Sequence, residues 1–131
     1  MEDVMIRISV LWIFFAVANS AHYAMCAFEP GALQKILSGA MTLRSPTAIG
    51  EAFASWLIPL TMAFLSVTLG DLANRDLNMV LGGLFSLWGI IHVMICPIVH
   101  VSDKPSAHQL LICISTIVVT ALIFWLALNW Q

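Results

Sequence analysis

The sequence has little charge. Asp, Glu, Lys and Arg make up 9% of its 131 residues, whereas soluble domains contain about 25%. Five Lys and Arg against seven Asp and Glu leave no basic surface, which excludes nucleic acid as a partner. Hydrophobic residues make up 61% of the chain, and the mean hydropathy is +0.98. One soluble core cannot bury that much apolar surface, so we expect the lipid bilayer to be the main partner.

The usual catalytic and cofactor motifs are also missing. The three cysteines form no CxxC pair, the histidines form no HExxH pair, and no glycine-rich phosphate loop is present. No nucleophile, base and acid can be matched to one another. The sequence therefore predicts no catalytic residue and favours a protein that is not an enzyme. Cysteines in apolar segments most often behave as small hydrophobic residues.

The few charged residues divide the chain into four apolar segments. The intervals Arg7–Glu29, Glu51–Asp71 and Asp76–Asp103 contain no charge, and none follows Lys104. A membrane-spanning helix needs about 20 apolar residues, and only helices or closed barrels satisfy the backbone in lipid. The strict alternation of a barrel strand is absent. We therefore predict an all-α, four-helix transmembrane bundle that forms one domain over residues 1–131, with helices at about 6–28, 48–69, 77–97 and 107–130.

The connection between the first two predicted helices is the only long one. Pro30 and Gly31 end the first helix. Apolar residues then recur at helical spacing, at Leu33, Ile36 and Leu37. This pattern predicts a short interfacial helix between the first and second spans. The connection over residues 70–78 is predicted to be a polar turn.

All histidines and cysteines map to one half of the predicted membrane. His22 and His92 lie near the ends of the first and third predicted helices, which run in the same direction, so both lie on the order of 10 Å below the same surface. A cysteine follows each of them one turn later. The other members of this group are Cys26, Cys96, His100, His108 and Cys113, and the acidic residues that border it are Glu29 and Glu51.

Three interpretations of His22 and His92 stay open. Neutral imidazoles can join helices through hydrogen bonds. The two histidines can be the cofactor-binding axial ligands of haem b, or part of a transition-metal site for copper or zinc. They can also handle protons or substrate, since histidine titrates near neutral pH. The candidate metal ligands are His22, Cys26, His92, Cys96, His100 and His108.

Small residues mark one face of the third predicted helix. Gly82 and Gly89 lie on the face of His92, and Gly82 forms a small-xxx-small pair with Ser86. Such residues mark helix–helix contacts in membranes. Asn19 and His22 lie one turn apart, and Asn19 is expected to bond His22 or a facing helix. The predicted packing residues are Gly82, Ser86, Gly89 and Asn19. They favour a homo-oligomer or a larger membrane complex as the functional state of the chain.

Short motifs are spread along nearly the whole chain. They are Met1-Glu2-Asp3-Val4 with Arg7 and Leu11-Trp12, Glu29-Pro30-Gly31 followed by Leu33-Gln34-Lys35-Ile36, Ile58-Pro59, and Asn74 and Asn78 before Gly82. Together they resemble a family of small four-helix membrane proteins of bacteria and archaea that is known only as a domain of unknown function. The resemblance implies the same fold and a place in the prokaryotic cytoplasmic membrane, and it implies no activity. Members tend to carry an acidic residue before the Ile-Pro pair, where this chain has Leu57.

These observations favour a non-enzymatic integral membrane protein that acts through helix-mediated assembly, as a homo-oligomer or an accessory subunit. The first alternative is a redox or metal-binding membrane protein that uses His22 and His92. The second is a small transporter with His22, His92 and Glu51 along its path, because ionisable residues inside a membrane are costly and mark function. The transporter interpretation predicts a water-filled cavity that reaches these residues.

Overall fold

Four long helical spans account for most of the chain. The computed structural model describes residues 2–39, 46–99 and 106–130. The longest elements are α1 (Glu2–Cys26), α5 (Asp71–Val99) and α6 (Ala107–Leu128), and the remaining span ends in α4 (Ile58–Thr68). The described ranges contain no strand. The predicted all-α, four-helix fold is therefore confirmed.

Local signals in the sequence set several helix ends. Glu2 and Asp3 occupy the first turn of α1, where negative side chains favour the positive end of the helix dipole. Gly31 has a φ of +81°, a conformation that residues with a Cβ rarely adopt. It reverses the chain into the short helix α2 (Ala32–Leu37). Ser106 caps α6 through a capping box with Gln109.

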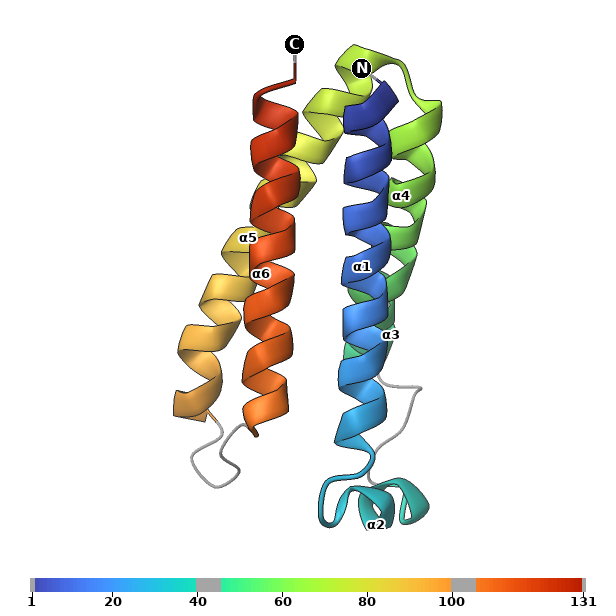
Figure 1. Ribbon diagram of the computed structural model, residues 1–131. Helices are drawn as coiled ribbons and strands as arrows, with labels where there is room; N and C mark the ends of the chain where they lie inside the picture. The colour runs from blue at the N-terminus through green and yellow to red at the C-terminus, as the bar shows by residue number, and fades with distance from the viewer. Residues whose placement is uncertain (1, 40–45, 100–105, 131) are drawn as a thin grey trace.

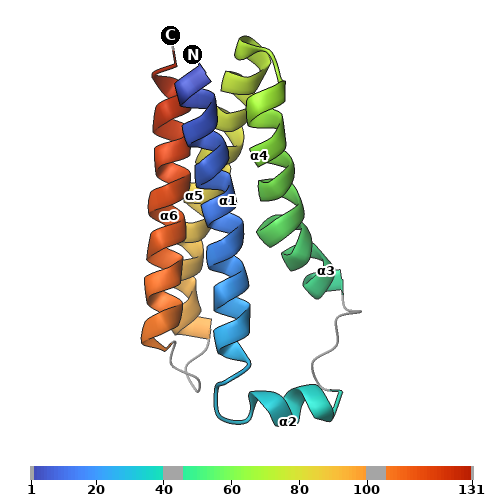
Figure 2. The same cartoon turned by 45° about the vertical axis from the view of Figure 1, so that its right-hand side comes forward.

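The spans form an antiparallel bundle with both termini at the same end (Figure 1). α1 packs against both α4 and α6, and α5 packs along α6. The contact between α4 and α5 is much slighter, and the two helices diverge away from the termini (Figure 2). The short helix α2 lies across the end of the bundle opposite the termini, where an interfacial helix is expected (Figure 2).

The second span combines three helical segments. α3 (Pro46–Ala52) leads into a π-helical turn, η1 (Phe53–Leu57), which leads into α4. Pro59 lies in the first turn of α4 and has no N–H to donate to the preceding turn. The N–H of Ile58 instead bonds the carbonyl of Phe53. The wider π turn therefore accommodates the proline without a break in the span.

The third span begins earlier than predicted. α5 starts at Asp71 rather than at residue 77, so most of the predicted polar turn is helical. Asn74 and Asn78 are fully buried. Asn78 donates from Nδ2 to Asn74 Oδ1 at 2.7 Å, and Asn74 donates from Nδ2 to the backbone carbonyl of Ser66 at 2.7 Å. The prediction of a turn was wrong because these polar side chains satisfy one another inside the bundle.

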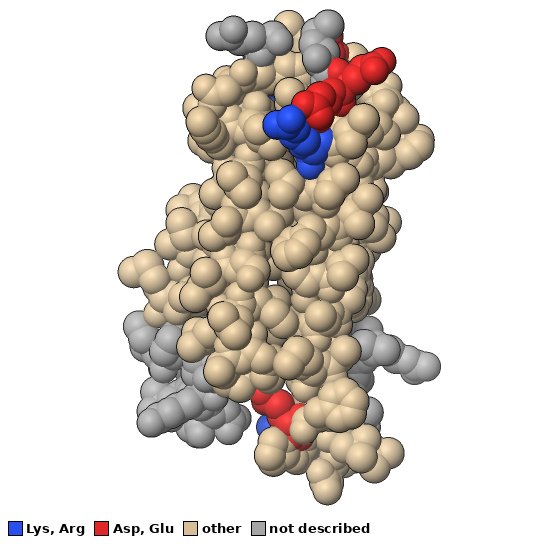
Figure 3. Space-filling model, in the orientation of Figure 1, with Lys and Arg blue, Asp and Glu red and all other residues tan. Residues whose placement is uncertain are grey.

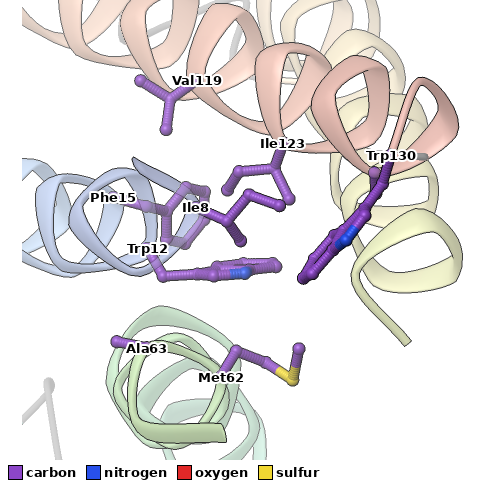
Figure 4. Close-up of a cluster of buried hydrophobic side chains, with 9 residues drawn as sticks. Ile8, Trp12, Phe15, Met62, Ala63, Val119, Ile123 and Trp130 are labelled. Atoms are coloured by element: carbon purple, nitrogen blue, oxygen red, sulfur yellow. The ribbon is translucent and has the colours of Figure 1, made fainter. Parts of the chain in front are cut away.

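The hydrophobic core lies in the half of the bundle that holds the termini. Trp12 donates from its indole N–H to Asn78 Oδ1 at 2.7 Å. Trp12, Phe15 and Phe85 also pack edge to face, with ring centroids 5.4–6.1 Å apart. The buried hydrophobic cluster, drawn in Figure 4, consists of Ile8, Trp12, Phe15, Met62, Ala63, Val119, Ile123, Ala127 and Trp130.

Glycines allow α5 to approach α6 closely. A Cβ on Gly82 would lie 2.9 Å from the backbone nitrogen of Phe124, and a Cβ on Gly89 would lie 2.7 Å from Ile117 Cγ1. Between them, Ser86 donates to Thr120 Oγ1 at 3.0 Å. The small-residue face of α5 therefore packs against α6 within the same chain.

The outside of the bundle suits a lipid environment. Large apolar side chains cover it, including Trp88, which is 67% exposed, and Phe64, which is 65% exposed. On the face shown in Figure 3, charged side chains gather at the two ends and a wide uncharged belt separates them. Among the described residues, four helices are long and apolar enough to cross a membrane, and they cover Glu2–Cys26, Pro46–Thr68, Asp71–Ile95 and Ala107–Leu128. These properties are those of a multi-pass membrane protein.

Candidate functional site

The end of α1 and the start of α6 bring three potential metal ligands together. His22 and Cys26 lie one turn apart on α1, and His108 lies in the first turn of α6. One ligand atom from each residue lies within 4.8 Å of the other two. Cys26 Sγ is 3.7 Å from His22 Nε2, and the rings of His22 and His108 have centroids 6.4 Å apart. We call these three residues the His–Cys cluster.

Polar side chains next to the His–Cys cluster hold it in place. Ser106, the N-cap of α6, has its Oγ 2.9 Å from His108 Nδ1. Glu29 Oε1 is 3.6 Å from His108 Nε2. Gln109 donates from its side-chain amide to Glu29 Oε1 at 3.3 Å and to Cys26 Sγ at 3.6 Å. The capping box that starts α6 therefore also links α6 to the end of α1, and such outer partners orient metal ligands.

The donor atoms of the His–Cys cluster suit a borderline or soft transition metal. Zinc binds thiolate and imidazole, and sites with three protein ligands keep a fourth position open for water. Copper also accepts this combination of ligands. The cluster is partly exposed, and a pocket of about 530 Å³ borders it, lined by Met25, Phe28, Glu29, Pro30, Ser106 and His108. An ion at the membrane surface can therefore reach the cluster.

A second cavity, of about 320 Å³, lies among the four spans on the inner side of His22. We call it the membrane cavity. It occupies the half of the bundle away from the termini, whereas the buried core fills the other half. Its polar lining consists of Asn19, His22, Tyr23, Glu51, Ser55, His92, Cys113 and Thr116. Its apolar lining consists of Phe15, Ala54, Phe85, Trp88, Gly89, Ile112 and Ile117.

Hydrogen bonds join α1 to the second span beside the membrane cavity. Trp56 donates from its indole N–H to Ser20 Oγ at 2.8 Å. The hydroxyl of Tyr23 lies 3.5 Å from Glu51 Oε2, to which it donates, and 3.4 Å from Ser55 Oγ. Ser55 and Trp56 belong to the π-helical turn, and such turns are frequent at functional sites. The turn therefore presents two polar side chains to α1 and keeps Glu51 beside Tyr23.

The structure separates the predicted ligands. His22, Cys26 and His108 come together, whereas His92 is not a member of that group, is exposed and lines the membrane cavity together with His22. The side chain of Cys96 and the whole of His100 fall outside the described residues, so their predicted ligand roles stay predictions. The haem interpretation of His22 and His92 likewise stays a prediction.

Other predicted residues have clear positions. Asn19 donates to the carbonyl of Phe15 in its own helix at 2.9 Å and lines the membrane cavity, rather than bonding His22 or a facing helix. Sequence reasoning missed Tyr23 and Gln109 as organising residues. The spacing of Ser106 and Gln109 is that of a capping box and was the available signal for Gln109. No pattern in the sequence pairs Tyr23 with the second span.

Comparisons of the chain with protein-family models, curated proteins and solved structures gave no match. The functional proposal below therefore rests on the geometry of the chain's own residues.

Proposed function

We propose that this chain is a multi-pass membrane protein that binds a transition metal ion, Zn²⁺ or Cu⁺, at His22, Cys26 and His108. The observation that supports the proposal is the approach of three donor atoms to within 4.8 Å of one another. His22 and Cys26 are neighbours on one helix in any case, but His108 comes from a different span. Packing of α6 against α1 is therefore needed to complete the set.

The surroundings of the cluster favour metal binding chemically. A metal ligand must be a thiolate or a neutral imidazole, and metal binding releases the protons. Glu29 Oε1 lies 3.6 Å from His108 Nε2, so a carboxylate faces the ring just beyond hydrogen-bond distance. Carboxylates that hydrogen-bond a ligating histidine fix its tautomer and increase its basicity. Gln109 approaches the sulfur of Cys26, and a donated hydrogen bond stabilises a thiolate.

The proposed setting is the prokaryotic cytoplasmic membrane, which rests on the resemblance of the sequence motifs to small bacterial and archaeal membrane proteins. Assembly into a homo-oligomer or a larger complex stays a separate prediction. Gly82 and Gly89, on which that prediction rests, lie against α6 of the same chain and are not free to contact a second copy there.

Metal binding is tested on the full chain purified in a maltoside detergent. Isothermal titration with Zn²⁺, and with Co²⁺ as a spectroscopic substitute, is expected to show one site per chain. A thiolate-to-cobalt charge-transfer absorption reports on the sulfur ligand. Cys26→Ser removes that absorption and weakens binding at least tenfold, and His108→Ala weakens binding to a similar extent.

Cys113→Ser is the matched control, because Cys113 lines the membrane cavity and lies outside the His–Cys cluster. This variant is expected to bind metal as the unaltered chain does. The proposal is wrong if the unaltered chain takes up no stoichiometric metal. It is also wrong if Cys26→Ser leaves the absorption and the affinity unchanged.

A further inference from the structure

The membrane cavity is lined by ionisable and aromatic side chains, most of which do not belong to the His–Cys cluster. It is lined by residues of all four spans, and these include Phe15 and Phe85, whose rings pack edge to face 5.4 Å apart. The same two rings pack against Trp12 of the buried core. Phe15 and Phe85 therefore lie between the cavity and the core.

The charge of the cavity has one sign. Glu51 is the only Asp, Glu, Lys or Arg residue among those that line it. The described basic residues lie elsewhere: Arg7 pairs with Asp3, Arg75 pairs with Asp76, and Lys35 belongs to α2. With neutral histidines the lining carries one negative charge. In a site flanked by lipid and apolar side chains, such a charge attracts a cation more strongly than it does in water.

The aromatic and apolar part of the lining favours an organic cation over a hydrated inorganic ion. Phe15, Phe85, Trp88 and Tyr23 contribute aromatic rings, and aromatic faces attract ammonium groups. The apolar side chains offer contact to a carbon skeleton but no ligand to an inorganic ion. A volume of about 320 Å³ is at the small end of ligand pockets, which span about 300–1,000 Å³.

We infer that the membrane cavity binds a small organic cation, a quaternary or protonated amine, with the Glu51 carboxylate as its counter-ion and aromatic rings around its apolar part. Tyr23 donates to Glu51 and so positions the carboxylate. The site does not depend on the proposed metal function, although His22 borders both. The chemistry of the ligand is shared by free organic amines and by the choline headgroup of a lipid.

The test uses the full chain, treated with a chelator to remove metal, in maltoside micelles. The probe is benzyltrimethylammonium, and binding is followed by isothermal titration and by quenching of tryptophan fluorescence. One saturable site per chain is expected. Glu51→Gln is expected to weaken binding about tenfold, because the variant keeps the size of the side chain and removes the negative charge that pairs with the cation. Glu2→Gln is the matched control, because Glu2 lies in the first turn of α1 and does not line this cavity, and it is expected to leave binding unchanged.

A comparison on the unaltered chain keeps the test decisive if Glu51→Gln fails to fold. Choline and 3,3-dimethylbutan-1-ol have the same shape and differ in charge. Choline is expected to displace the probe, and the neutral alcohol is not. Equal displacement by both compounds, or full binding by a folded Glu51→Gln variant, overturns the inference.

Two further experiments distinguish the cation site from the metal site and a lipid headgroup from a free amine. Cys26→Ser, which removes one of the proposed metal ligands, is expected to retain cation binding. Loss of cation binding in this variant would contradict a cation site that is separate from the metal site. In nanodiscs of phosphatidylglycerol the probe binds as in micelles. Competition by phosphatidylcholine in the discs assigns the cation to a lipid headgroup, and absence of competition assigns it to a free amine. Either result supports a cation site.

Discussion

The buried asparagine pair allows a quantitative test of how the bundle is held together. Asn78 accepts a hydrogen bond from Trp12 at 2.7 Å and one from Ser66 at 3.3 Å, and it donates to Asn74 at 2.7 Å. All four side chains are fully buried. Asn78→Ala removes these bonds and leaves the Trp12 indole N–H and the Asn74 side-chain oxygen without their partner in a dry environment. We expect a large loss of stability.

The expected loss can be bracketed. Hydrogen bonds between helices in membranes average about 0.6 kcal/mol each, which sets a lower limit of about 1 kcal/mol for the two bonds that join Asn78 to Trp12 and Ser66. Each of the two buried groups left unsatisfied costs about 1–3 kcal/mol, which raises the expected loss to about 4 kcal/mol. Asn78→Ala should therefore lower the free energy of unfolding by about 1–4 kcal/mol.

The measurement is reversible unfolding in mixed micelles of maltoside and dodecyl sulfate, followed by circular dichroism. Asn129→Ala is the matched control, since Asn129 is exposed and bonds only the carbonyl of Trp125 in its own helix. It should change the free energy of unfolding by less than about 0.5 kcal/mol. A cost for Asn78→Ala no larger than that of Asn129→Ala would refute the role given to the buried network.

Three other predictions follow from the same structure. Gly82→Ala should destabilise the bundle by about 1–3 kcal/mol in the same unfolding assay, because the new Cβ meets the backbone of Phe124 at 2.9 Å. Gly50→Ala is the control, because nothing lies within 4 Å of its new Cβ, and it should be neutral or stabilise the helix by up to about 1 kcal/mol. Equal destabilisation by Gly82→Ala and Gly50→Ala would argue against close α5–α6 packing. Gly31→Ala should cost about 1–2 kcal/mol, because the φ of +81° suits glycine, and an unchanged midpoint would contradict that backbone conformation. Zinc affinity measured by titration calorimetry should fall as the pH drops from about 7.5 to about 5.5, because protons compete for the two imidazoles and the thiolate; affinity that does not change with pH would contradict histidine and cysteine ligands.

The span pattern was predictable because lipid imposes a simple rule on it. The number of residues between Arg7 and Glu29, for example, matches the thickness of a bilayer, and α1, which ends at Cys26, covers most of that interval. The boundary before α5 was not predictable in the same way. Asn74 and Asn78 are polar, and polarity indicates a turn unless the partners are known. Those partners, Trp12 and Ser66, come from other helices, so no local pattern contains them.

The candidate site was predictable only in part, for a similar reason. Counting residues along each helix places His22, Cys26 and His108 at one membrane surface. Which of these residues meet depends on the order of helices around the bundle, and that order follows from packing at the opposite end. α6 lies beside α1, so His108 joins the cluster, whereas His92 on α5 lines the membrane cavity. The π turn that presents Ser55 to Tyr23 accommodates Pro59. A proline within a helical segment indicates a kink, but it does not indicate a π turn or the side chains that such a turn presents.

X-ray absorption at the zinc edge is the most direct test of metal binding by the His–Cys cluster. The measurement uses the full chain loaded with one equivalent of Zn²⁺. We expect one sulfur ligand at about 2.3 Å and two imidazole nitrogens at about 2.0–2.1 Å, with the sulfur absent in Cys26→Ser. A spectrum of oxygen and nitrogen ligands alone in the unaltered chain would contradict the account.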